Sequence, residues 1–171
     1  LRIYGYNNVE FGSKLNASVS FQAQPDNEKL VNTMSDFLTS NGFSEIMSNS
    51  LTRADYYAGL NTFPPEASVP MLNPLSADLN VMRQTLLFGG LEAIARNINH
   101  KNPDQRLYEY GRVYFLKNGD VSRFENFIER PAFGLFLTGN REEQSWTEED
   151  KPADFFGLKA YYLNFLKKLH Y

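Results

Sequence analysis

The stretch YEYGRVYFLKNG, residues 108–119, decides the fold. Its aromatic and β-branched residues are typical of a β-strand, and its closing Asn-Gly pair is typical of a tight hairpin turn. We therefore predict a long strand over residues 105–116 and a hairpin turn at residues 117–120. Because side chains alternate along a strand, Arg112 shares one side of it with three tyrosines, which are Tyr108, Tyr110 and Tyr114.

Amphipathic helices are predicted before and after this strand in the sequence. Residues 25–42 carry a capping Asp26, an acidic Glu28 in the first turn and Gly42 as the stop, which predicts a helix over about 26–41. Its apolar residues recur at helical spacing on one face: they are Leu30, Val31, Met34, Phe37 and Leu38.

Two more helices are expected, over about 82–99 and from Asp154 to the end of the chain. The first should bury a stripe made of Leu87, Leu91, Ile94 and Ile98. The second should bury Phe155, Leu158, Tyr162, Phe165 and Leu169. Gly89 and Gly90 each disfavour a helix by ~1 kcal/mol relative to alanine, so we expect another backbone to pack closely against them.

The remaining segments predict a mixed α+β domain. Strands are expected at 43–51 and 69–72, together with a central strand at 132–138 that is buried on both faces. A capping-box pattern predicts a short helix over 52–60, and a polar loop at 139–153 carries Trp146. Residues 1–24 are predicted to be an extended connector. This order favours an antiparallel sheet flanked by long helices.

Composition excludes several classes of protein. The length of 171 residues fits one domain, and the net charge of −3 argues against a nonspecific nucleic-acid coat. The absence of cysteine rules out disulfides and thiolate metal sites, and it fits a cytosolic protein. No apolar run approaches the roughly 20 residues of a membrane helix. The chain starts without methionine, and we expect it to be a piece of a longer chain.

No catalytic or metal-ligating residue is predicted from motifs. His100 ends a predicted helix and His170 is the penultimate residue, and neither has the spacing of a metal pair. The sequence contains no P-loop, no dinucleotide-binding glycine motif and no nucleophile elbow. The acidic stretch at 142–150 matches no ligand pattern, which favours a solvated loop.

Two arginines remain as candidates. Arg83 is predicted to begin a helix, where free backbone amides could help to hold an anion. Arg112 lies in the middle of the predicted strand among tyrosines. A structural ion pair or stacking on aromatic rings explains both arginines equally well, so both are candidate structural residues.

Four stretches together resemble the beta subunit of bacterial phenylalanyl-tRNA synthetase. They follow one another in the order of that family and span nearly the whole chain: RIYGYNN at 2–8, NPLSADLNVMRQTLLFGGLEAIARN at 73–97, RLYEYGRVYF at 106–115 and DFFGLKAYYLNFL at 154–166. The resemblance implies a class II aminoacyl-tRNA synthetase fold, an antiparallel sheet flanked by helices that is here truncated at its C-terminus. It also implies a module that has lost its chemistry.

The loss of chemistry is implied at the end of the long strand. Active class II strands carry an aromatic residue, an arginine, any residue and an acid, and the arginine holds the ATP α-phosphate. Here Phe115 stands at the arginine position and Lys117 at the acid position. The resemblance therefore implies no catalytic residue in this chain. The alternative is a self-sufficient ATP-dependent class II ligase or adenylating domain.

The resemblance further implies a scaffold for a catalytic alpha subunit in an (αβ)₂ enzyme of the cytoplasm. In the family, the helix at about 26–41 packs across the subunit boundary, so four of its residues are either core or interface: Leu30, Met34, Phe37 and Leu38. ATP, magnesium and tRNA-Phe belong to the holoenzyme, and the magnesium-binding module precedes the connector at 1–24. Residues 25–171 are then a core module that is incomplete at its C-terminal end and prone to self-association in isolation.

Overall fold

The computed structural model describes residues 3, 5, 8, 26–141, 146 and 150–169, with the side chain of residue 118 left out. The predicted connector at 1–24, the acidic stretch at 142–150 and His170 lie wholly or mostly outside these residues. The helices and strands follow in the order α1 (Asn27–Ser40), β1 (Ser44–Glu45), β2 (Leu51–Thr52), β3 (Val81–Met82), α2 (Leu87–Asn99), β4 (Gln105–Leu116), β5 (Phe127–Thr138) and α3 (Phe155–Lys168).

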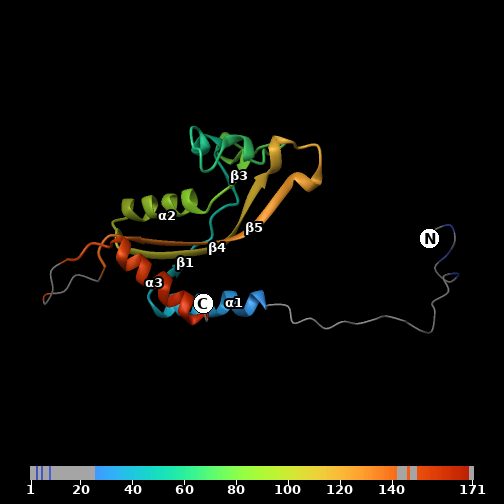
Figure 1. Cartoon of the computed structure of the whole chain (residues 1–171). Helices are drawn as coiled ribbons and strands as arrows, with labels where there is room; N and C mark the ends of the chain where they lie inside the picture. Colours follow the sequence, from blue (N-terminus) through green and yellow to red (C-terminus); the bar gives the residue numbers. More distant parts are fainter. Residues whose placement is uncertain are drawn as a thin grey trace.

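A three-stranded sheet in the order β1-β4-β5 forms the centre of the domain. β4 is antiparallel to β5 and parallel to the short β1, while β2 and β3 form a separate antiparallel pair. Helix α2 lies on one face of the β4–β5 ribbon, and α1 and α3 lie on the other (Figure 1). The prediction of an α+β domain with helices flanking a sheet is confirmed.

Helix α1 forms where its caps predict it. The Asp26 side chain accepts a hydrogen bond from the backbone N–H of Lys29 at 3.0 Å, and Gly42 follows the helix with a φ of +78°. Met34 and Leu38 are buried, with 7% and 0% of their surface exposed. Leu38 packs in the main apolar cluster, whose other members are Phe43, Tyr108, Phe37, Phe133, Leu135 and Tyr161.

Strand β4 has the predicted bounds, but its connection to β5 is not a tight hairpin. Pairing is continuous from Gln105 opposite Thr138 to Leu116 opposite Phe127. Residues 117–126 then join the strands through two short 3₁₀ turns, Lys117–Gly119 and Phe124–Asn126. The expected two-residue turn at the Asn-Gly pair is therefore wrong, because the strand partner begins only at Phe127.

Strand β5 was expected to be central and is instead the edge strand of the described sheet. It also begins at Phe127 rather than at 132, although Pro131 lies within it. The backbone N–H of Tyr114 donates to Arg83 at 2.9 Å, so the even-numbered residues of β4 turn their backbone groups away from β5. Pro131 is paired with Arg112. Its missing N–H therefore lies on the outer edge, where proline is tolerated.

Helix α2 starts five residues later than predicted, because Val81–Met82 is the strand β3. Only Ile94 of the expected stripe is buried, whereas Leu87, Leu91 and Ile98 are 44%, 48% and 48% exposed. The cause is Gly90, which lies against the ring of Phe136 and brings the helix axis close to β5. The buried face is centred on Gly90 and Ile94, so the other apolar residues lie on the flank of the helix.

Other short elements differ from expectation. The predicted strand at 43–51 is split into β1 and β2, and the predicted strand at 69–72 is a single bridge between Pro70 and Val81. The expected helix at 52–60 is a 3₁₀ turn, Ala54–Tyr57, without a side-chain cap. Helix α3 begins as predicted, since Asp154 accepts a hydrogen bond from the N–H of Gly157. Of its expected stripe only Phe165 is fully buried.

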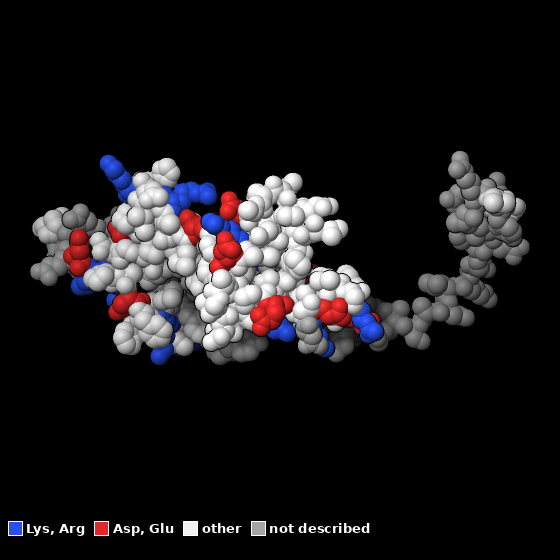
Figure 2. Space-filling model, turned by 90° about the horizontal axis from the view of Figure 1, so that it is seen from above, with Lys and Arg blue, Asp and Glu red and all other residues white. Residues whose placement is uncertain are grey.

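Charge is mixed on the face of the molecule that carries α2. Seen from above, acidic and basic side chains are interspersed among uncharged ones on the described surface (Figure 2). This distribution agrees with the small net charge and gives the visible described face no continuous basic stripe. Among the described helices, none is long and apolar enough to span a membrane.

Candidate functional site

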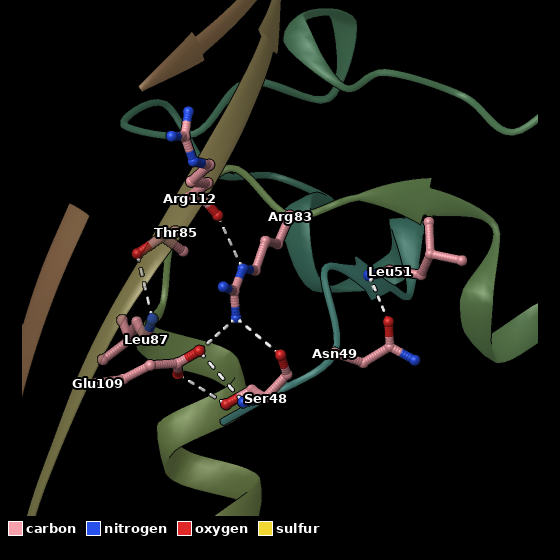
Figure 3. Close-up of polar contacts among 8 residues, drawn as sticks. All are labelled: Ser48, Asn49, Leu51, Arg83, Thr85, Leu87, Glu109 and Arg112. Carbon is pink, nitrogen blue, oxygen red and sulfur yellow. Dashed lines mark hydrogen bonds and ion pairs between the residues drawn. The ribbon is translucent and has the colours of Figure 1, made fainter. Parts of the chain in front are cut away.

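A buried ion pair lies between the β4–β5 ribbon and the start of α2. The Nη1 atom of Arg83 is 2.7 Å from Oε1 of Glu109, and their side chains are only 7% and 2% exposed. Arg83 also donates from Nε to the carbonyl of Arg112 at 2.9 Å and from Nη1 to the carbonyl of Ser48 at 3.3 Å. The guanidinium therefore links its own segment to two others that are distant in the sequence, β4 and the segment at Ser48 (Figure 3).

Both carboxylate oxygens of Glu109 accept hydrogen bonds within this cluster. Its carboxylate accepts hydrogen bonds from the backbone N–H of Ser48 at 3.1 Å and from the Ser48 hydroxyl at 2.7 Å (Figure 3). Two donors and one opposite charge offset the cost of removing the carboxylate from water. The site is consequently a closed, neutral network rather than an open binding centre.

Glycines leave room for the cluster. A Cβ at Gly111 would collide with the Nη2 atom of Arg83, so a larger residue there would displace the guanidinium from its position beside Glu109. A Cβ at Gly89 would lie 2.6 Å from the Ser48 hydroxyl oxygen. Gly89 and Gly90 are thus inside α2 because side chains, those of Ser48 and Phe136, pack against them. The expectation of a packing role holds, but the neighbours are side chains and not a backbone.

Arg83 does not begin a helix, which corrects one expectation. It follows β3, and α2 starts at Leu87, whose N–H donates to the Thr85 hydroxyl at 3.2 Å. The backbone of Arg83 is tied on both sides, since its N–H donates to Ser50 and its carbonyl accepts from Tyr114. With Glu109 beside it, the Arg83 guanidinium is already neutralised and is poorly placed to hold an anion.

Arg112 lies on the opposite face of β4. Its side chain is 61% exposed and forms an ion pair with Glu129 of β5 at 3.2 Å. It also lines a cavity of about 380 Å³ between β4 and the first turn of α1, beside Tyr110 and Glu28. The arginine of β4 that lies over an aromatic ring is Arg106, whose Cζ is 5.9 Å from the ring centroid of Tyr161.

Phe115 and Lys117 lie at the far end of β4, away from the buried ion pair. Phe115 is paired with Ile128, and the guanidinium of Arg130 lies over its ring at 5.9 Å from the centroid. Strand alternation puts Phe115 on the same face as Glu109. Lys117 is exposed and begins the 3₁₀ turn that leaves the strand. A phenyl ring under a cation of β5 thus occupies this end of the face.

The four residues named on α1 divide into two groups. Met34 and Leu38 belong to the core of the domain, whereas Leu30 is 40% exposed. Phe37 is half-buried, and its ring centroid is 6.4 Å from that of Phe165 in α3. The apolar stripe of α1 therefore contributes to the domain core and also presents apolar surface outward.

A cavity of about 290 Å³, lined mainly by polar residues, adjoins the ion pair beside the first turns of α2. Its lining includes Arg83, Ser48 and a layered group in which the rings of Tyr56 and Phe88 stack at 4.8 Å. The Tyr56 hydroxyl contacts Glu92, and this hydrogen bond and burial raise the pKa of Tyr56. No group of three potential metal ligands occurs among the described residues.

Sequence reasoning missed Glu109 and Ser48 as partners of Arg83. The available signal was an acid within a strand rich in aromatic and apolar residues, because such a charge is buried only with a partner. The partner could not be named, since Arg83 and Ser48 are 26 and 61 positions away along the chain.

Comparisons with known proteins agree with the geometry. Residues 13–171 match the family described as "Phenylalanyl tRNA synthetase beta chain CLM domain". A phenylalanine–tRNA ligase beta subunit of Bacteroides thetaiotaomicron is 46% identical over 99% of this chain and 21% of its own length. That of Porphyromonas gingivalis is 40% identical over 94% of this chain and 20% of its own length.

Solved structures support the fold alone. A pyrrolysyl-tRNA synthetase of Desulfitobacterium hafniense superposes with a TM-score of 0.56 at 15% identity, covering 86% of this chain and 46% of its own. An ATP phosphoribosyltransferase regulatory subunit/histidyl-tRNA synthetase of Bacillus halodurans C gives 0.53 at 13% identity, covering 78% of this chain and 34% of its own. The sheet and helices are therefore those of class II synthetase-like proteins.

The chain spans about a fifth of the length of these curated relatives. The family match extends from residue 13 to residue 171. On this match and on the similarity to beta subunits, the chain belongs to the phenylalanyl-tRNA synthetase beta chain CLM domain family.

Proposed function

We propose that this chain is a non-catalytic, class II-like module of a phenylalanine–tRNA ligase beta subunit, and that it scaffolds the catalytic alpha subunit. The whole enzyme would be an (αβ)₂ assembly in the cytoplasm that uses ATP and magnesium to attach phenylalanine to tRNA-Phe. The support is the family match, together with the residues at the end of β4.

Phe115 is the observation that carries the proposal. The ring of Phe115 cannot neutralise the charge that develops on a phosphoryl group, and it is covered by the guanidinium of Arg130. Lys117 has the wrong sign to replace a metal-binding carboxylate. The neighbouring Arg83 is occupied by Glu109. A nucleotide on this face of the sheet would therefore find no unpaired arginine at residue 83 or 115. It would also find no acid at residue 117 to hold a metal ion.

The partner surface that we propose includes the outward part of α1. Leu30 is 40% exposed and Phe37 is half-buried at the surface of the domain. Apolar and aromatic residues of this kind are enriched at subunit interfaces. The alpha subunit would cover this side, while Met34 and Leu38 hold the helix to its own domain.

We further propose that residues 25–171 belong to one class II-like core module. It would follow a connector at 1–24 and, before that, a magnesium-binding module of the longer subunit. Cofactors and tRNA would contact other parts of the enzyme.

The test combines calorimetry with a binding assay. The chain is titrated with ATP and with phenylalanine, and in parallel it is offered to the matching alpha subunit. We expect no heat of ligand binding and retention of the alpha subunit. Heat with either ligand would favour the alternative, a self-sufficient ATP-dependent class II ligase. A Leu30→Glu variant should weaken retention, whereas Glu45→Gln on the exposed strand β1 serves as the surface control.

A further inference from the structure

The cavity beside Arg112 lies where the first turn of α1 passes the middle of β4, on the face of the sheet that carries α1. Its volume is about 380 Å³, and its lining comes from four residues of the helix and two of the strand: Asn27, Glu28, Val31, Asn32, Tyr110 and Arg112. Leu30, 40% exposed, belongs to the same turn of α1. The cavity therefore adjoins the surface that we propose for the alpha subunit.

The uncompensated charge in this cavity is that of Glu28. Arg112 already has a counter-charge, because Glu129 of β5 lies at 3.2 Å. Among the described residues, no ion pair involves Glu28. Lys29 belongs to the same turn of the helix but is not part of the lining. The exposed Glu28 carboxylate is thus available to an incoming group.

The positive end of the α1 dipole does not reverse the sign of this charge. A helix N-terminus carries about half a positive charge, whereas Asp26 and Glu28 bring two carboxylates to this end. Asp26 already accepts a hydrogen bond from the N–H of Lys29 at 3.0 Å, so an anion is in place at the cap. The cavity consequently favours a cation over a second anion.

We propose that the cavity receives a basic side chain, a lysine or an arginine, of the catalytic alpha subunit. The inference rests on the proposed scaffold function, in which the alpha subunit covers the outward part of α1. The cation would pair with Glu28 and lie against Tyr110, which is 37% exposed, since aromatic rings attract cations and the stems of basic side chains pack on them. Leu30 would supply apolar contact beside the ion pair. Such a pair fixes the orientation and the choice of the partner.

Two acidic residues of α1 give a matched test of the charge. Glu28→Gln and Asp36→Asn each remove one negative charge from an exposed position of the helix, and only Glu28 lines the cavity. The changes are made in the intact beta subunit, and the dissociation constant of its complex with the alpha subunit is measured by sedimentation at several salt concentrations. Glu28→Gln should raise this constant at least about fivefold and reduce its dependence on salt. Asp36→Asn should leave it within about twofold.

Tyr110 tests the aromatic wall of the cavity separately. Tyr110→Phe keeps a ring beside the cation and should leave the dissociation constant within about twofold. Tyr110→Leu removes the ring and should raise the constant about threefold or more. Equal effects of the two changes would remove the ring from the proposed contact.

A double-mutant cycle identifies the occupant. Each lysine and arginine of the alpha subunit is changed to glutamine, once beside the unaltered beta subunit and once beside Glu28→Gln. One of these changes should lose most of its effect when the Glu28 charge is already removed. Equal affinities of Glu28→Gln and Asp36→Asn, or coupling of Glu28 only to a basic residue of the beta subunit itself, would overturn the proposal and leave the scaffold role intact. Failure of the unaltered subunits to associate would overturn both.

Discussion

At the scale of single residues, the ion pair of Arg83 and Glu109 has the largest expected effect on stability. Arg83→Met leaves the Glu109 carboxylate buried without its counter-charge, and loss of one partner of a buried pair costs about 3–5 kcal/mol. The free energy of unfolding in urea should fall by this amount. The double variant Arg83→Met with Glu109→Met should lose much less than the sum of the two single changes.

Arg112→Met is the matched control for this pair. Its partner Glu129 lies at 3.2 Å, but both side chains are substantially exposed. An exposed ion pair contributes about 0–1 kcal/mol, so the control should change the stability little. Equal losses at Arg83 and Arg112, or strict additivity in the double variant, would contradict the account of the cluster.

Tyr57 provides a pH-dependent probe of the same region. Burial raises the pKa of Tyr57, with the hydrogen bond from the Gln84 N–H at 2.9 Å acting in the opposite direction. A raised pKa in the folded state means that its stabilising effect is complete below the ordinary tyrosine value of about 10 and is lost as the pH rises through the folded value. Stability should therefore decrease above about pH 10, and Tyr57→Phe should reduce that decrease. An unchanged alkaline profile in the variant would assign the decrease to other groups.

At the scale of elements, helix α1 distinguishes core from surface within one apolar stripe. Met34→Asp should destabilise the domain by several kcal/mol, since an unpaired charge would be placed at a buried position. Leu30→Asp, four residues earlier and 40% exposed, should cost far less in the isolated chain. Thermal unfolding of both variants is the measurement, and similar losses would show that the burial of the helix face is assigned wrongly.

The end of α2 offers a stabilising change. Lys101 follows the helix with a φ of +62°, a left-handed conformation that L residues disfavour, and its N–H caps the carbonyl of Ile98. Glycine adopts this conformation without strain, so Lys101→Gly should raise the stability by about 0.5–1 kcal/mol. Lys101→Ala removes the same side chain without relieving the backbone and is the control. A gain in both variants would point to the charge instead.

Periodicity and caps made α1, β4 and α3 predictable from the sequence. Asp26 and Asp154 cap their helices as expected, and β4 has its predicted bounds. Strands of two residues, such as β3, carry too little pattern to be recognised. The prediction of the buried face of α2 was wrong because Gly90 packs against Phe136, and such tertiary contacts override helical periodicity.

The candidate site was only partly predictable for a related reason. The sequence identified Arg83 and Arg112 as structural candidates but placed Arg83 at a helix start. Its partner Glu109 is brought to it by the packing of β4 against the segment that follows β3, where the N–H of Tyr114 donates to the Arg83 carbonyl, and no local pattern encodes this contact. The significance of Phe115 and Lys117 could be predicted only from the resemblance to a family, since nothing in a phenylalanine itself indicates that an arginine has been lost.

At the scale of the whole molecule, the chemistry should not return with a single substitution. Phe115→Arg would place a second guanidinium beside Arg130, without an acid at residue 117 to hold a metal ion. We expect no phenylalanine-dependent exchange of pyrophosphate into ATP by the variant chain, measured beside the unaltered chain. Appearance of exchange would mean that this face of the sheet retains a working site, and the scaffold proposal would fail.

The glycine at residue 111 has a consequence for how this module can change over time. Because a Cβ there would collide with Arg83, and Arg83 in turn neutralises Glu109, the three positions form one inherited unit. A side chain at residue 111 would displace Arg83, and Glu109 would then be buried without its counter-charge. A change at any one of them is therefore expected to be tolerated only together with changes at the other two, so related chains should carry either the complete trio or an apolar replacement of it.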